Sequence, residues 1–236
     1  MRYGPRRAQR VEVGLPPGAG PHPVAVLLHG GFWRARYDLS LGRPLAADLV
    51  RHGWAAWNVE YRRVGNGGGD PATLDDVAAA IDALAEHDLD LTRVIAVGHS
   101  AGGHLATWAA SRGRHARWPA RVELTGVVAQ AGVLDLRAAH DEHLGAGAVE
   151  AFLGHAPGPE DAAADPGRQI PLDVSVHCVH AVADDVVPIS QSRAYVDAAT
   201  RAGASAALTE VEGDHFTVID AESEAWRATL RILEEL

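Results

Sequence analysis

The chain has very little cysteine and no long apolar run. Among its 236 residues Cys178 is the one cysteine, which excludes an internal disulfide and a cysteine-rich zinc site. It lies in the apolar stretch VSVHCVHAV, where a buried structural role is favoured over a reactive thiol. No stretch reaches the roughly 20 apolar residues that span a membrane, and the basic N-terminus has no apolar signal-peptide core. We therefore expect a cytoplasmic protein.

Clustered positive charge is scarce as well. The formal net charge is −10, and the arginines are scattered among acids apart from a few at the N-terminus. Because nucleic-acid binding needs clustered Lys and Arg to neutralise phosphates, this composition argues against a nucleic-acid partner. Hydrophobic residues make up 47% of the chain, enough for a sizeable core, and the length fits one domain over residues 1–236.

Short apolar runs alternate with segments of helical period. The runs predict strands at Val24–His29, Ala55–Val59, Val94–Gly98, Gly126–Gln130, Val174–Ala183 and Ala206–Val211, and Val24–His29 and Val94–Gly98 have the continuous apolar composition of buried strands. The periodic segments predict helices near Leu41–Leu49, Leu74–Leu84, Gly102–Ser111, Ile189–Ala202 and Trp226–Leu233. This alternation predicts an α/β fold, with a mostly parallel central sheet flanked by helices on both faces.

One segment, residues 134–170, departs from this alternation. It is rich in Ala, Gly, Pro and charge and has weak periodicity. We interpret it as a small insertion of short helices and a candidate cap over a site. No internal repeat and no separate domain is evident.

The stretch GHSAGGHLA places Ser100 directly after a predicted buried strand and before a predicted helix. A serine there sits on a sharp turn, for which Gly98 and Gly102 supply the room. The helix N-terminus also directs N–H groups towards the hydroxyl. The pattern therefore predicts that Ser100 is a nucleophile.

A serine hydroxyl needs a base, and histidine is suited to neutral pH. Of the thirteen histidines, His215 lies in a loop that follows the last predicted strand, where loops line the ligand crevice of an open sheet. A carboxylate must orient that base, and VADDVVP offers Asp184 or Asp185 at the end of another strand. Both His177 and His180 are interpreted as core or face residues of a strand.

The segment HGGFW follows the first long buried strand and predicts an oxyanion pocket. The expected donors are the N–H groups of Gly31 and Phe32, together with that of Ala101 after the nucleophile. Trp33 is either an apolar wall for the acyl group, together with Phe32, or ordinary core packing. His99, which precedes the nucleophile, is a further candidate substrate contact.

These segments together resemble the α/β-hydrolase superfamily, and more narrowly its esterase and lipase branch related to hormone-sensitive lipase and to kynurenine formamidases (arylformamidases). HGGFW is similar to the HGGYW signature of the formamidases, and ADDVVPISQS and GDHF resemble the family's acid and histidine segments. The resemblance covers Val24 to Leu236. In such proteins the acid precedes Val-Pro by three residues, which implies Asp184 rather than Asp185. Phe32 stands where the hormone-sensitive-lipase side has a third glycine.

The resemblance implies a serine hydrolase that cleaves small carboxylic esters through a Ser-His-Asp triad and an acyl-enzyme. The alternatives are an arylformamidase acting on amides such as N-formylkynurenine, and acyl transfer with the same triad. We expect no cofactor and no metal, since HDEH at 140–143 has the spacing of a solvated charge run. The partner expected is a small-molecule ester or amide. YRR at 61–63 either reaches the site or pairs with Asp75 or Asp76.

Overall fold

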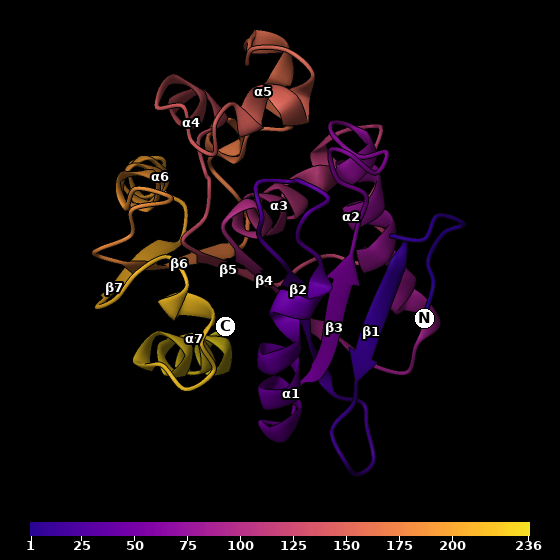
Figure 1. Cartoon of the computed structure of the whole chain (residues 1–236). Helices are drawn as coiled ribbons and strands as arrows, with labels where there is room; N and C mark the ends of the chain where they lie inside the picture. The colour runs from indigo at the N-terminus through magenta and orange to yellow at the C-terminus, as the bar shows by residue number, and fades with distance from the viewer.

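A seven-stranded sheet runs through the middle of the computed structural model, which describes all residues 1–236 (Figure 1). Its strand order is β1-β3-β2-β4-β5-β6-β7, and every neighbouring pair is parallel except β1 with β3. The strands are β1 Arg10–Gly14, β2 Pro23–Leu28, β3 Ala55–Glu60, β4 Asp90–His99, β5 Gly126–Gln130, β6 Ser175–Ala181 and β7 Ala206–Val211. The mostly parallel α/β architecture expected from the sequence is confirmed.

The sequence pattern did not indicate β1. Its five residues, RVEVG, alternate between apolar and polar types and form an antiparallel edge strand against β3. A short half-exposed edge strand lacks the continuous apolar run that marks strands covered on both faces. Its pairing is determined by the neighbouring strand rather than by its own composition.

Helices cover both faces of the sheet, and the two faces have separate cores. On one face α1 (Arg43–Arg51) and α7 (Glu224–Glu235) contribute to a cluster that includes Ala25 and Leu27 of β2. On the other face α2 (Ala72–Asp82), α3 (Ala101–Ala109) and α6 (Ser190–Arg201) contribute to a second cluster, which includes Val24, Val26 and Leu28 of β2. The alternation along β2 sends successive side chains to opposite faces, as a doubly covered strand requires. No helix combines the length and the apolar character needed to cross a bilayer.

Residues 134–170 form short helices, as expected. They are α4 (Leu136–Asp141), α5 (Ala148–Leu153) and two 3₁₀ turns, η4 (Pro159–Ala163) and η5 (Pro166–Gln169). In Figure 1 α4 and α5 lie at the top of the molecule, above α3 and α6. The insertion is fastened to α3 because His104 and Trp108 hydrogen-bond to the carbonyls of Ala164 and Ala163.

Candidate active site

Ser100 stands on the turn between β4 and α3. Its backbone has φ 56° and ψ −119°, a strained combination that residues with a Cβ rarely adopt. The turn is held because the Ser100 N–H donates to the Gln130 carbonyl at 2.8 Å and the Ser100 carbonyl accepts from the His104 N–H at 3.1 Å. The expected strand-turn-helix setting of Ser100 is what the structure contains.

Two glycines allow this turn to pack. A Cβ added to Gly98 would overlap the Gly102 carbonyl, and a Cβ added to Gly102 would overlap the Leu28 carbonyl. Each neighbouring atom is backbone and cannot rotate away, so no side chain fits at either position. The interpretation that both glycines make room for the elbow agrees with this packing.

The loops after β6 and β7 bring a histidine and a carboxylate together. His215 Nδ1 donates to Asp184 Oδ2 at 2.7 Å, and the Asp184 side chain is fully buried. The other oxygen, Oδ1, accepts from the backbone N–H groups of Val186 and Val187 at 2.9 and 2.8 Å. Asp185 is exposed. Of the two acids that the sequence left as alternatives, Asp184 is therefore the one that contacts His215.

A second histidine, His180, contacts the same carboxylate. Its Nε2 lies 3.2 Å from Asp184 Oδ2 and 2.9 Å from the Val187 carbonyl, while its Nδ1 accepts from the Ser192 hydroxyl at 2.8 Å. Burial opposes the charge of Asp184, but hydrogen bonds from His180, His215 and Val187 outweigh it and hold its pKa well below the usual range. His180 was interpreted as a strand residue without a role. The signal that it offered is its position four residues before Asp184 in a buried strand.

His99 lies behind His215 rather than in the open. It is 5% exposed, its ring centroid is 4.5 Å from that of His215, and its Nε2 donates to the His215 carbonyl at 2.9 Å. Burial lowers the pKa of His99 to about 3, with the nearby His215 adding to the effect, so the ring is neutral. No hydrogen bond of the structure joins the Ser100 hydroxyl to His215. The segments of the two residues meet through His99 instead.

The loop after β2 has an unusual backbone conformation and unpaired N–H groups. Gly31, Phe32 and Trp33 all have positive φ, at 113°, 51° and 54°. The N–H groups of Gly31 and Phe32 have no acceptor within the chain. The N–H of Ala101, the first residue of α3, belongs to the helical turn that has no intrahelical partner. These three N–H groups were the donors expected from the sequence.

Residues 29–33, which we call the oxyanion loop after the donors expected in it, are anchored by Glu60, the last residue of β3, and by Tyr61. The Tyr61 hydroxyl donates to the His29 carbonyl at 2.5 Å, and the two rings stack with centroids 4.4 Å apart. Glu60, 2% exposed, lies 3.4 Å from His29 Nε2 and pairs with Arg63 at 2.8 Å. It also accepts from the backbone N–H groups of Leu39 and Tyr61. Glu60 thus ties the strand end to the loop.

The segment YRR divides between the two interpretations given for it. Arg62 pairs with Asp76 through two hydrogen bonds of 2.8 and 2.6 Å, which is the structural pairing expected. Arg63 instead turns to Glu60 under the oxyanion loop. Sequence reasoning missed Glu60, because a glutamate at the end of an apolar strand has no pattern that reveals its partners.

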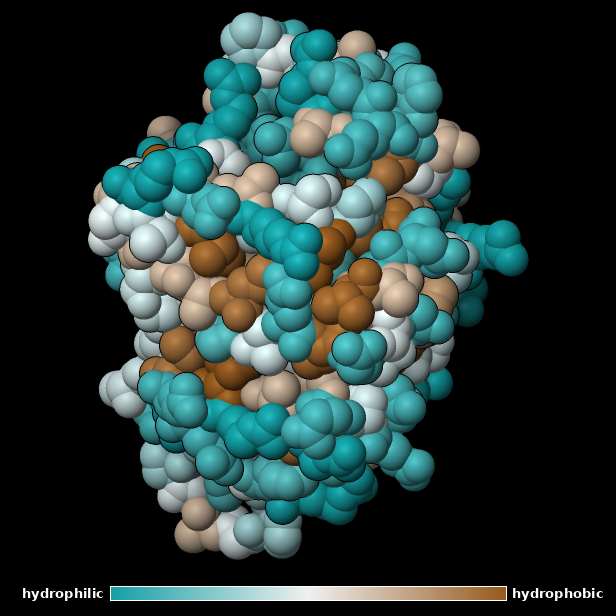
Figure 2. All heavy atoms as spheres, turned by 90° about the vertical axis from the view of Figure 1, so that its left-hand side faces the viewer, coloured by the Kyte–Doolittle hydropathy of each residue, from teal (hydrophilic) through white to brown (hydrophobic).

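The two aromatic residues of the loop have different surroundings. Trp33 is 1% exposed, stacks on Phe152 at 4.8 Å and donates from Nε1 to His104 Nδ1, which is the core-packing alternative. Phe32 is half-buried, with its ring against Gly145 of the insertion. Hydrophobic atoms also gather midway up the face shown in Figure 2, between hydrophilic atoms above and below. Of the two rings, that of Phe32 is the one that keeps exposed surface, and that of Trp33 belongs to the core.

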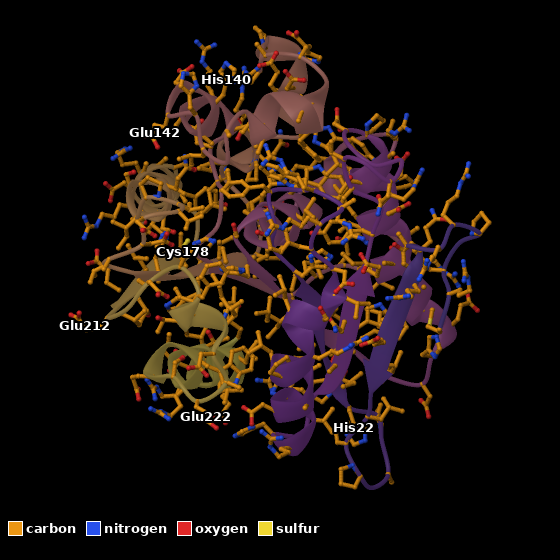
Figure 3. The ribbon with its side chains drawn as sticks, viewed as in Figure 1. His22, His140, Glu142, Cys178, Glu212 and Glu222 are labelled. Carbon is orange, nitrogen blue, oxygen red and sulfur yellow. The ribbon has the colours of Figure 1, made fainter.

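Neither HDEH nor the cysteine forms a site. His140 and Glu142 lie at the outer edge of the insertion (Figure 3), and the residues of HDEH do not converge as metal ligands. Elsewhere one group, His155 with Glu160 and Asp161, has ligand spacing, but two of its three residues are exposed. Cys178 is buried in β6, where burial raises the pKa of its thiol to about 12. The expected structural role of Cys178 agrees with this burial.

Comparison with known proteins places this geometry in a family. A family model described as BD-FAE matches residues 12–198, most of the chain. The chain belongs to the BD-FAE family. No curated protein matches this BD-FAE chain.

Solved structures resemble the BD-FAE chain over nearly its whole length. A truncated carbohydrate esterase from gut microbiota superposes with a TM-score of 0.83 at 20% identity, covering 100% of this chain and 94% of that one. Esterase 2 of Thermogutta terrifontis gives 0.79 at 21%, covering 100% and 89%. An acetyl ester-xyloside bifunctional hydrolase from Caldicellulosiruptor lactoaceticus gives 0.79 at 20%, covering 95% and 85%. The predicted α/β-hydrolase fold is confirmed, whereas the narrower resemblance to formamidases and hormone-sensitive lipase gains no confirmation from these matches.

Proposed function

We propose that this BD-FAE chain is a serine hydrolase that cleaves small carboxylic esters, with Ser100 as nucleophile, His215 as base and Asp184 as the orienting acid. One observation carries the proposal. A serine in strained backbone geometry at a strand-helix elbow lies beside a loop whose histidine is hydrogen-bonded to a buried carboxylate. Strain of this kind is retained where the surrounding structure enforces it, commonly at catalytic residues.

The reaction follows from these positions. Ser100 Oγ attacks the ester carbonyl carbon while His215 Nε2 takes its proton, and Asp184 stabilises the imidazolium through Nδ1. The carbonyl oxygen becomes an oxyanion and accepts from the N–H groups of Gly31, Phe32 and Ala101. His215 returns the proton to the leaving alcohol, and an acyl-enzyme remains on Ser100. Water then attacks it with the same proton path, releasing the acid.

The substrates that we propose are esters with small acyl groups. The similar structures include a carbohydrate esterase and an acetyl ester-xyloside bifunctional hydrolase, so acetyl esters of carbohydrates are the first class to test. The half-buried Phe32, next to the proposed N–H donors, supplies apolar surface for an acyl chain or an uncharged leaving group. A preference between these classes comes from differences in transition-state binding, which a substrate panel measures.

The decisive test compares Ser100→Ala with Ser205→Ala, an exposed serine outside the site. With p-nitrophenyl acetate we expect Ser100→Ala to lose at least about 10⁴-fold in kcat and Ser205→Ala to match wild type. A fluorophosphonate probe should label wild type and Ser205→Ala only. Esterase activity retained by folded Ser100→Ala would overturn the mechanism.

A substrate panel then places the reaction among its alternatives. It combines p-nitrophenyl esters from acetyl to octanoyl, acetylated xylose and N-formylkynurenine, each with and without an alcohol acceptor. We expect the highest kcat/KM for acetyl and no acyl product on the acceptor. Preferred cleavage of N-formylkynurenine would instead indicate a formamidase, and acylated acceptor would indicate acyl transfer.

A further inference from the structure

A pocket of about 420 Å³ lies next to the oxyanion loop and is lined mainly by arginine. Its walls come from the segment before β1, the end of β3 and the loop after Trp33. The side chains that give it its character are Arg6, Arg7, Arg10, Arg62, Arg63 and Asn66. Only two carboxylates, Asp38 and Glu60, share the lining. We call this cavity the arginine pocket.

Arg63 is the innermost of these side chains and is left with unused donors. The residue is 4% exposed, and its Nη2 pairs with Glu60 at 2.8 Å. Its Nε and Nη1 are buried and have no hydrogen-bond partner, and the same holds for Nε of Arg10. Buried donors are nearly always paired in native proteins, because an unpaired one gives up its bonds to water without replacement. Arg63 is thus a charged side chain of the pocket lining whose hydrogen-bonding capacity is not fully used within the chain.

The rim arginines are also free to meet an anion. No carboxylate pairs with Arg6, Arg7 or Arg10, whereas Arg43 close by on α1 is held by Glu12 at 2.7 Å. Arg62 is occupied by Asp76. In a chain with a formal net charge of −10, this is a local excess of uncompensated positive charge. Such an excess inside a concave site concentrates field and attracts anions.

We propose that the arginine pocket is a binding site for an oxyanion group, a phosphate or carboxylate carried by a small molecule. Guanidinium groups match the planar or tetrahedral oxygens of these groups better than any other side chain. One residue, Glu60, separates the arginine pocket from the oxyanion loop, because Glu60 contacts both Arg63 and His29. The anion is either an acidic group of the ester substrate or a free anion that binds beside the loop.

Calorimetric titration of the full chain with sodium phosphate and with sodium glucuronate, at constant ionic strength, tests the site directly. The matched variants are Arg7→Gln/Arg10→Gln, at the rim, and Arg201→Gln, an exposed arginine of α6 outside the pocket. We expect saturable binding of at least one probe, weakened about tenfold or more in the double variant and unchanged in Arg201→Gln. Thermal unfolding without probe checks that both variants fold.

A kinetic arm separates the two sources of the anion, and it rests on the proposed ester hydrolysis. It compares acetylated glucuronate with acetylated glucose, which differ by one carboxylate. A substrate-borne group predicts about tenfold higher kcat/KM for the acidic ester in wild type and no preference in Arg7→Gln/Arg10→Gln. A free anion predicts binding without that preference.

Two results would overturn the proposal. One is the absence of saturable binding of both probes, and the other is equal binding by wild type and folded Arg7→Gln/Arg10→Gln. Calorimetry needs no turnover, so inactivity towards all esters would refute the proposed function while leaving this result readable.

Discussion

Two histidine–carboxylate contacts lie at the carboxyl edge of the sheet, one on each side of Ser100, and they differ in what else the carboxylate touches. On one side Asp184 is 2.7 Å from His215 and meets a second histidine and two backbone N–H groups. On the other side Glu60 is 3.4 Å from His29 and pairs with Arg63 at 2.8 Å. The same two chemical groups therefore occur in two electrostatic settings.

The difference indicates that the two carboxylates, Asp184 and Glu60, have different roles. Asp184 has no arginine partner, so its negative charge is available to the imidazolium that the proposed mechanism requires. The charge of Glu60 is already balanced by Arg63, so Glu60 is suited to hold the oxyanion loop in place rather than to tune a base. Both pairs are buried, and burial alone does not reveal which one is chemically active.

The largest effect is expected at the proposed acid. Asp184→Asn keeps the shape but removes the charge and favours the wrong tautomer of His215, so kcat with p-nitrophenyl acetate should fall about 10³- to 10⁴-fold. Its neighbour Asp185, which is exposed, provides the control, and Asp185→Asn should change kcat less than about twofold. Equal losses in both variants would remove Asp184 from the mechanism.

On the opposite side, Glu60→Gln should act mainly on stability. It leaves the Arg63 guanidinium as a buried unpaired charge, which typically costs about 3–5 kcal/mol of unfolding free energy. We expect kcat to fall only about tenfold, as a loosened loop holds the oxyanion less well. Urea denaturation and steady-state kinetics measure both. Glu12→Gln breaks a surface pair and should cost less than about 1 kcal/mol. A kcat loss as large as that of Asp184→Asn would erase the distinction between the two pairs.

His180 contributes to the low pKa of Asp184 and thereby to the pH dependence of stability. Its contact helps to lower the pKa of Asp184, so the folded protein gains stability above the ordinary carboxyl pKa and loses it as pH falls below about 4. His180→Gln should therefore lower unfolding free energy by about 1–2 kcal/mol at pH 7 and lessen the further loss at pH 3.5. Urea titrations at the two pH values measure this. His143→Gln, at an exposed histidine of the insertion that does not contact Asp184, should keep the wild-type pH dependence.

A third buried carboxylate, Asp165, is expected to affect stability in the opposite direction and to leave kcat unchanged. Burial, with help from nearby Asp135, raises the pKa of Asp165 to about 6. The folded state thus binds its proton more tightly than the unfolded chain, and stability falls as pH rises from about 4 to 6. Asp165→Asn should be about 1–2 kcal/mol more stable than wild type at pH 8 and equal to it at pH 4. Asp173→Asn, at a 93% exposed side chain, should show no such difference in thermal or urea unfolding.

Local pattern was sufficient for most of the fold. Apolar runs located six of the seven strands: β2 to β6 are largely buried and have the composition of doubly covered strands, whereas β7 is a half-exposed edge strand. The residues proposed for catalysis could also be identified from the sequence. Ser100, Asp184 and His215 each follow a strand, and the carboxyl ends of parallel strands share one edge of the sheet. The local sequence pattern therefore predicts which loops lie at the carboxyl edge of the sheet.

The local sequence pattern could not predict the roles of the residues that support the site. His180, Glu60 and Arg63 each lie in or next to a strand, and their roles depend on which distant side chain meets them. Trp33 could not be assigned to core or site because its surroundings include Phe152, more than a hundred residues along the chain. Long-range partners of this kind follow from the packed structure alone.

The fastening of the oxyanion loop to the insertion bears on how the protein can be altered. Arg34 donates to the carbonyls of Gly145 and Ala146 at 2.6 and 3.0 Å, and Phe32 rests on Gly145. Exchanging residues 134–170 for those of another family member, to change which acyl groups are accepted, would also remove the support of the N–H donors. Under the proposed function, substrate selection by the insertion and oxyanion binding by residues 29–33 are coupled through these contacts. A graft that retains the 145–146 carbonyls is the one expected to preserve both.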